Sequence, residues 1–331
     1  MKKYRSLGII LLAFAMLLGA CAPAATPTAA PAPTAALAAA TLAPTAEPTA
    51  AAETGISLTD GLGRTVTLAA PAASIVSLAP SNTEILYAVG AGEHVIARDD
   101  FSNYPEEVAD LPSVGGSNSN YSLEQLVSLK PDLILAAEIN TADQVKAMED
   151  LGLTVFYLKN PDDLDGMYAN LLTVAELTGT TAETETLISS LKERVQAVET
   201  ALANVDTQPS VFYELDATDA AAPWTSGPDT FIDTLIGMAG GVNAAAGLNS
   251  GWAQMSQESL LVANPDIILL ADAAYGVSAE QVAARPGWDV ITAVKDSAIY
   301  PFNDDLVSRP GPRQVDALEE LAKLIHPEAF E

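Results

Sequence analysis

The stretch SLEQLVSLKPDLIL, Ser122 to Leu135, occurs again in altered form as SQESLLVANPDIIL, Ser256 to Leu269. Seven of the fourteen positions are identical, and two more exchange one of Leu, Ile and Val for another. In each copy a serine precedes a helical apolar pattern, a proline ends the helix, and a run typical of a strand follows. A glutamate, Glu124 or Glu258, occupies the second helical position. We therefore predict two equivalent helix–strand units, one in each of two similar lobes.

The rest of the folded region predicts an α/β protein with mostly parallel sheets. Short apolar runs alternate with helix-sized segments on both sides of one long segment that lacks Gly and Pro. That segment, Thr181 to about Ala203, would form a helix of roughly 33 Å, long enough to join two lobes. We predict an N-terminal α/β lobe over 56–165, a linking helical segment over 166–205 and a C-terminal α/β lobe over 206–331.

Local signals predict one further helix start in the N-terminal lobe. SNTEILYAVGAG begins at Ser81 and has Glu84 three residues later, which is the signature of a capping box. Gly90 is expected to end this helix.

The first 55 residues predict export and membrane anchoring. Residues 1–20 combine a basic start, an apolar run and small residues, which is typical of a secretory signal. The sequence LLGAC that follows resembles a bacterial lipobox, in which the cysteine is lipidated after cleavage. Because Cys21 is the only cysteine, we expect a lipid anchor there, on the extracytoplasmic face of the cell membrane, and no disulfide or thiol site. Residues 21–55 are nearly all Ala, Pro and Thr and predict an extended tether.

The charge balance is strongly acidic, with 43 Asp and Glu against 15 Lys and Arg. Nucleic-acid binding needs a basic surface, so no nucleic-acid partner is expected. The excess is typical of a solvated acidic surface that favours solubility.

Patterns typical of catalysis and metal binding do not occur in the sequence. There is no G-x-S-x-G, H-E-x-x-H or phosphate-loop motif. His94 and His326 are the only histidines and lie far apart in the chain, which excludes a His-rich metal site. We expect no catalytic residue, no catalytic cofactor, no resident metal and no enzyme activity.

Five motifs in order carry a family resemblance: IVSLAPSNTEILYAVGAG, DDFSNYPEEVADLPSVGG, SLEQLVSLKPDLILA, PWTSGPDTFIDTLIGMAGGVN and DDLVSRPGPR. Together they resemble the substrate-binding proteins of ABC importers for vitamin B12, ferric siderophores and haem, most of all the vitamin B12-binding members. The resemblance spans Ile56 to Pro327. It implies a monomer of two α/β lobes joined by one long helix, with a small-molecule ligand held in the cleft between the lobes.

The same resemblance implies a protein partner. In this family a glutamate on each lobe docks onto arginines of the membrane permease, and Glu124 and Glu258 match those positions. A two-fold symmetric permease, driven by its ATPase, would need one docking unit per lobe. The alternative is that both glutamates only favour a helix N-terminus, an effect worth about 0.3–1 kcal/mol each.

The ligand is expected at the carboxyl ends of the strands, where open α/β sheets bind ligands. Trp224 and Trp252 lie among turn residues and are predicted in loops, where a flat ring can cover a macrocycle at small entropic cost. The resemblance implies corrin contacts for these two and for Phe101, and two more of its aromatic positions are Ser117 and Ala137 here. The expected ligand-binding residues are Pro80, Ser81, Asn82, Phe101, Tyr104, Trp224, Thr225, Trp252, Asp305 and Arg309.

Arg309 and Arg313 form a second pattern at this site. Four residues apart, they would share a face if helical and could hold an anionic group. Pro310 and Pro312 instead favour a loop, with Arg313 starting the last helix.

These features predict a membrane-tethered solute-binding lipoprotein that delivers a corrinoid to an ABC permease. A ferric hydroxamate siderophore or haem is the alternative ligand, whereas a tri-anionic catecholate would find few basic residues. An enzyme on a similar scaffold, or a surface adhesin or sensor, are the alternative classes. The missing catalytic motifs argue against the first, and the paired glutamates argue against the second.

Overall fold

A four-stranded parallel sheet forms the N-terminal lobe of the protein, whose computed structural model describes residues 55–116 and 120–331. The strand order is β4-β3-β5-β6, and a separate antiparallel hairpin, β1-β2, precedes it. The strands are β1 (Ile56–Thr59), β2 (Thr65–Leu68), β3 (Ile75–Ser77), β4 (Val95–Ala97), β5 (Leu133–Ala137) and β6 (Val155–Leu158). The helices of this lobe are α1 (Pro80–Ala88), α2 (Leu123–Leu129) and α3 (Ala142–Glu149), with short 3-10 turns at Gly92–His94 and Glu106–Asp110.

A six-stranded sheet forms the C-terminal lobe, in the order β10-β8-β7-β11-β12, with β9 paired to β7. The strands are β7 (Ser210–Asp216), β8 (Trp224–Ser226), β9 (Val242–Asn243), β10 (Trp252–Gln254), β11 (Ile267–Leu270) and β12 (Ile299–Pro301). The helices are α6 (Phe231–Met238), α7 (Gln257–Ala263), α8 (Ala279–Ala283), α9 (Thr292–Lys295), α10 (Asp305–Ser308) and α11 (Gln314–Ile325). Short 3-10 turns lie at Ala271–Tyr275, Trp288–Val290 and Pro327–Ala329. The predicted α/β class with mostly parallel sheets is confirmed.

The edge of this second sheet differs from the prediction. Trp224 and Trp252 lie on β8 and β10, which pair antiparallel with each other, and not in loops. Each of these strands has only three residues. Strands this short lack the alternation of polar and apolar residues from which a sequence pattern is recognised.

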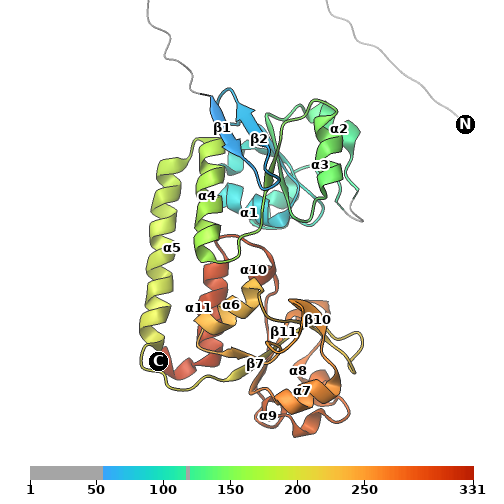
Figure 1. The fold of residues 1–331 in the computed structure, drawn as a ribbon, viewed down its shortest axis with the longest axis vertical. Helices are drawn as coiled ribbons and strands as arrows, with labels where there is room; N and C mark the ends of the chain where they lie inside the picture. The colour runs from blue at the N-terminus through green and yellow to red at the C-terminus, as the bar shows by residue number, and fades with distance from the viewer. Residues whose placement is uncertain (1–54, 117–119) are drawn as a thin grey trace, which may run out of the picture. The chain divides into compact units, whose positions relative to one another are not determined.

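Two long helices connect the lobes. Helix α4 (Leu164–Thr178) ends at Gly179, whose φ of 78° is left-handed, and α5 (Thr181–Leu202) follows with 22 residues, close to the predicted bounds. Figure 1 shows α5 running along both α4 and α11. Arg194 of α5 ties α5 to α11, because its guanidinium donates to Asp316 at 2.6 Å and to both oxygens of Glu319 at 2.8 Å.

The hydrophobic core is continuous through this connection. One large cluster includes buried side chains of both sheets together with Leu171 of α4, Leu191 of α5 and Leu318 of α11. Each lobe has a further cluster of its own, around Leu126 in the first and Leu260 in the second. The linking segment is therefore packed into the core of the protein.

The repeated units fold as predicted. The Ser122 hydroxyl accepts from the Gln125 amide at the start of α2, and the Ser256 hydroxyl accepts from the Ser259 amide at the start of α7. Each helix has seven residues and ends on a left-handed residue, Lys130 or Asn264, before its proline. Strand β5 or β11 then follows, so the equivalence of the two units is confirmed.

The predicted capping box at Ser81 is wrong. Helix α1 starts at Pro80, with Ala79 as N-cap and no side-chain cap. Proline suits the first helical position because its ring fixes a helical φ and it has no N–H to satisfy. Glu84 is drawn away from the helix start and instead bonds Arg309 and Arg313.

Several expectations fall on residues outside the described ranges. These are the secretory signal (1–20), lipidated Cys21 and the tether (21–55, described only at residue 55), and Ser117. Within the described ranges, no helix is both long enough and apolar enough to span a bilayer.

Candidate functional site

Three hollows at the carboxyl ends of the strands define the candidate site, which we call the cleft. Two of them, each about 210 Å³, share Asn160, Ser308 and Pro310 among their lining residues. Both therefore have walls from the N-terminal lobe, at the end of β6, and from the C-terminal lobe, between α10 and α11. The third, about 580 Å³, lies where β7 and β11 end and is lined by Asp216 and Ala271, among others.

Five of the expected ligand-binding residues line the cleft. Pro80, Ser81 and Arg309 line one of the two smaller hollows and Trp252 the other, while Trp224 lines the largest.

The two tryptophans project from the same face of the sheet edge. In the antiparallel register Trp252 lies opposite Ser226 and Trp224 lies opposite Gln254, so both side chains fall on one face. Such diagonal neighbours lie roughly 7–8 Å apart at their backbones, within reach for large aromatic rings. Trp224 is 43% exposed and Trp252 50% exposed, although both are large apolar groups. The edge therefore offers two adjacent flat rings to a ligand.

Two expected residues lie in the protein interior instead. Asn82 is buried and its side chain donates to the Leu135 carbonyl at 3.1 Å. Thr225 is fully buried on the opposite face of β8 from the tryptophans. Neither side chain lines the cleft; Asn82 ties α1 to β5.

Phe101 and Tyr104 lie in the loop after β4, and both are about half exposed. The loop is held by Asp99, whose carboxylate accepts from the Phe101 amide at 2.7 Å and from the Ser102 hydroxyl. Burial raises the pKa of Asp99, and these hydrogen bonds offset part of the rise. The ring of Tyr104 stacks on the guanidinium of Arg313 at 4.1 Å.

Arg309 and Arg313 do hold an anionic group together, and that group is the protein's own Glu84. Arg309 Nη1 donates to Glu84 Oε1 at 2.9 Å, and Arg313 donates to both oxygens at 2.8 and 3.0 Å. Arg309 also bonds Asn103 Oδ1 at 2.7 Å and Asp305 Oδ1 at 2.7 Å. Burial raises the pKa of Glu84, while the two guanidiniums act against that rise. This cluster joins the lobes directly at the edge of the cleft.

A second group of buried charges lies behind the largest hollow. Tyr213 donates to Asp304 Oδ1 at 2.6 Å, and both oxygens of Glu214 accept from Arg285. Asp272 is 5% exposed, and its Oδ1 has no partner among the described groups. Burial, followed by the charge of Glu214, raises the pKa of Asp272 to about 6.

Sequence reasoning missed Tyr275, Ile139 and Asn160 as cleft residues. Tyr275 is 90% exposed and lines the hollow that contains Trp224, and Ile139 is 58% exposed beside Ser81 and Arg309. All three follow the end of a strand by a few residues. The strand-end rule would have found them if it had been applied to β5, β6 and β11 as well.

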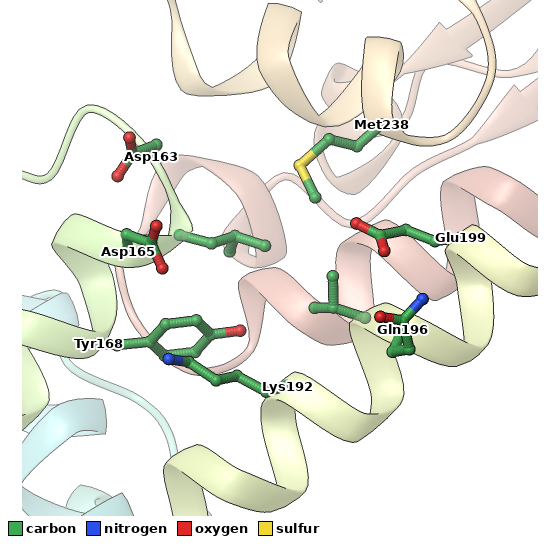
Figure 2. Close-up of a pocket in the computed structure, with 9 residues that line it drawn as sticks. Asp163, Asp165, Tyr168, Lys192, Gln196, Glu199 and Met238 are labelled. Atoms are coloured by element: carbon green, nitrogen blue, oxygen red, sulfur yellow. The ribbon is translucent and has the colours of Figure 1, made fainter.

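Two further hollows lie outside the cleft: one of about 390 Å³ is lined by Glu84, Tyr104 and Arg313, and one of about 420 Å³ lies along the linking helix between α4, α5 and α6 (Figure 2). The labelled residues of the larger one include Asp163, Asp165 and Glu199, which are exposed acidic groups. The ammonium of Lys192 lies 5.0 Å from the centre of the Tyr168 ring. None of the expected ligand-binding residues lines this larger hollow and no strand ends there, so the cleft remains the better candidate.

The two glutamates of the repeat are exposed, one in the first turn of α2 and one in the first turn of α7. Exposed apolar side chains accompany them, with Val127 at 41% on α2 and Val262 at 82% on α7. Each lobe thus presents an exposed glutamate and an exposed valine on a short helix, although the two valines are not at equivalent positions of the repeat.

The described residues include no group of three or more His, Cys, Asp or Glu side chains placed to hold a metal ion. His326 is buried and bonds the Gly240 carbonyl at 3.1 Å, which is a structural contact.

Comparison with known proteins shows the family to which the chain belongs. Residues 75–306 match the periplasmic binding protein family. The chain belongs to this family. Among its relatives is an uncharacterized ABC transporter substrate-binding lipoprotein of Bacillus subtilis, 35% identical over 280 residues, covering 83% of this chain and 87% of the relative.

Two solved structures are similar to this chain in fold. The periplasmic vitamin B12-binding protein of Vibrio cholerae is 26% identical with a TM-score of 0.66, over 79% of this chain and 99% of its own. A periplasmic haem-binding protein of Roseiflexus, in its apo form, is 27% identical with a TM-score of 0.69, over 77% and 98%. This periplasmic binding protein is therefore of the ABC-transporter substrate-binding class, whose members differ in their ligands.

Proposed function

We propose that the protein is an extracytoplasmic lipoprotein that captures a corrinoid and delivers it to an ABC permease. The observation that carries this proposal is the pair of half-exposed tryptophans on one face of the β8–β10 edge, beside exposed Tyr275. Isolated large apolar groups on a surface are common, but here Trp224 and Tyr275 line the largest hollow of the cleft and Trp252 lines another, which together indicate a binding site. A macrocycle offers the large flat area that such rings bind best.

The alternative ligands within the same class are a ferric hydroxamate siderophore and haem. The haem-binding relative has the same fold and similar identity, so fold alone does not distinguish these ligands. The contacts that the cleft makes with a ligand must distinguish a corrinoid from a siderophore or haem.

Delivery would use Glu124 and Glu258. Their positions on equivalent capped helices, one per lobe, suit a two-fold symmetric permease. Anchoring would use lipid on Cys21, with residues 22–55 as the tether.

Equilibrium binding with the intact lipoprotein tests the ligand. We expect cyanocobalamin to bind with a micromolar or lower Kd by isothermal titration calorimetry, and more tightly than ferrichrome-type complexes or haemin. Binding of cyanocobalamin no tighter than millimolar would overturn the corrinoid proposal in favour of whichever other compound binds.

A further inference from the structure

The charges that line the cleft are almost all negative. Asp216, Asp229 and Asp304 contribute carboxylates, and Arg309 is the one cation among the described lining residues. Lys159 neighbours Asn160 in sequence, but it is not among the lining residues. Asp229 lines one of the smaller hollows and Arg309 the other, while Asp216 and Asp304 line the largest.

The guanidinium of Arg309 is already paired with carboxylates of the protein itself. Arg309 is 11% exposed and bonds two carboxylates, Glu84 at 2.9 Å and Asp305 at 2.7 Å. Arg313 is held by both oxygens of Glu84 and covered by the ring of Tyr104. Glu84 is 1% exposed at its side chain, so water does not separate it from its partners.

We infer that the cleft selects ligands whose periphery is uncharged and rich in N–H donors, and that Glu84 is the residue that sets this selectivity. Glu84 keeps both arginines away from an incoming anion. A ligand carboxylate that entered either of the hollows lined by aspartate would lose its water and face a like charge with no available cation, which is unfavourable. A peripheral carboxamide would instead donate to those aspartates, in hydrogen bonds strengthened by the acceptor's charge.

This inference rests on the proposed function and sharpens its ligand class. It favours carboxamide-bearing corrinoids and uncharged hydroxamate complexes. It disfavours haem, whose two propionates are anionic.

A matched pair of ligands tests it on the full-length protein. The pair is cyanocobalamin and the derivative in which one peripheral propionamide has been hydrolysed to a carboxylate. We expect the carboxylate to bind at least tenfold more weakly at pH 7.5. Equal or tighter binding of the carboxylate would overturn the inference while leaving the corrinoid function intact.

Two variants test the role assigned to charge. Glu84→Gln releases the arginines, and Asp229→Asn removes a cleft carboxylate at a left-handed position, φ 59°, that asparagine tolerates. In both, the ratio of the two dissociation constants should fall by at least threefold. Because a ratio is compared, a general loss of affinity has no effect on the result. Asp229→Asn still tests the inference if Glu84→Gln does not fold.

The control is Asp206→Asn, an exposed residue between α5 and β7, which should leave the ratio unchanged. If neither variant changes the ratio, or if the control changes it equally, the inference is wrong.

Binding of haemin distinguishes failure of the corrinoid function from failure of the charge selectivity. If neither corrinoid binds, an uncharged ferric hydroxamate complex binds and haemin does not, then the corrinoid function fails and the charge selectivity stands. Micromolar binding of haemin would contradict the charge selectivity whatever the natural ligand is.

Discussion

Glu84 and Arg313, 229 residues apart in sequence, form a buried bidentate pair: Arg313 Nε lies 2.8 Å from Glu84 Oε2, and Nη2 lies 3.0 Å from Glu84 Oε1. The fork geometry of guanidinium and carboxylate makes this the strongest type of charged hydrogen bond. It joins α1 in one lobe to the start of α11 in the other.

Breaking this pair should destabilise the protein. Arg313→Ala leaves a buried carboxylate with one partner fewer and removes the stacking on Tyr104, so we expect a loss of about 3–5 kcal/mol in the free energy of unfolding. Urea unfolding followed by circular dichroism measures it. Lys146→Ala, which breaks an exposed pair with Asp150 at the end of α3, is the control and should leave stability nearly unchanged. Equal effects would show that the Glu84 pair contributes no more than a surface pair.

The docking glutamates should matter to transport and not to folding. The double variant Glu124→Ala/Glu258→Ala removes two exposed first-turn carboxylates, so unfolding should change by only about 1 kcal/mol. Loss of charged partners at a docked interface weakens binding by about 2–5 kcal/mol. We therefore expect normal ligand binding but no stimulation of the permease's ATPase in proteoliposomes.

A matched control exists for this prediction. Asp143 on α3 and Glu280 on α8 also occupy the second helical position after a capping Thr or Ser, one in each lobe. Asp143→Ala/Glu280→Ala should keep full ATPase stimulation. If both double variants behave alike, the glutamates of the repeat have no special role.

The two tryptophans should contribute to ligand affinity. Trp224→Ala and Trp252→Ala each remove a half-exposed ring, and each should weaken binding by about 1–3 kcal/mol while leaving the melting temperature nearly unchanged. Calorimetric titration with cyanocobalamin provides the measurement. Val290→Ala, another exposed apolar residue that lines none of the three hollows, should leave affinity as it was. Unchanged affinity in both tryptophan variants would place the ligand elsewhere.

Asp272 should make stability depend on pH. Its pKa in the folded protein is raised from 3.8 to about 6, so the folded state binds a proton more readily than the unfolded chain does. Stability associated with this residue is therefore greatest below about pH 4 and is lost as pH rises through about 6. Asp272→Asn should raise the free energy of unfolding by about 1–3 kcal/mol at pH 7.5, and by much less at pH 4. A gain of the same size at both pH values would rule out titration of Asp272 as the cause.

Cys21 tests the membrane anchor. Cys21→Ser should move the protein from the membrane fraction to the soluble fraction of cell lysates, because no other cysteine can carry the lipid. The released protein should keep its ligand affinity. Continued membrane association would refute the lipoprotein assignment.

Local signals in the sequence predicted the elements of the fold well. Ser122 and Ser256 cap their helices as expected, and the bounds of α5 differ from the predicted ones by about one residue. These features depend on neighbours within four residues or on unbroken periodicity, which a single sequence displays directly.

Long-range pairings could not be predicted in this way. Glu84 had a plausible local role in a capping box, yet its partners lie more than 220 residues away. The pairing of β8 with β10 likewise joins two three-residue strands separated by α6, and it is this pairing that brings Trp224 beside Trp252. Selection from strand ends picked side chains that line a hollow, such as Pro80 and Ser81, and also one that turns inward, Asn82.

The length of helix α5 affects the relative rotation of Glu124 and Glu258 more than the distance between them. Each residue of an α-helix adds about 1.5 Å in length but about 100° in rotation. Inserting one residue into α5 would barely separate the lobes, yet it would turn one of them by more than a quarter of a circle about the helix axis. The orientation of Glu124 relative to Glu258 would then change. The number of residues in α5 therefore sets the rotation between the two proposed docking surfaces, so we expect insertions in α5 to abolish transport.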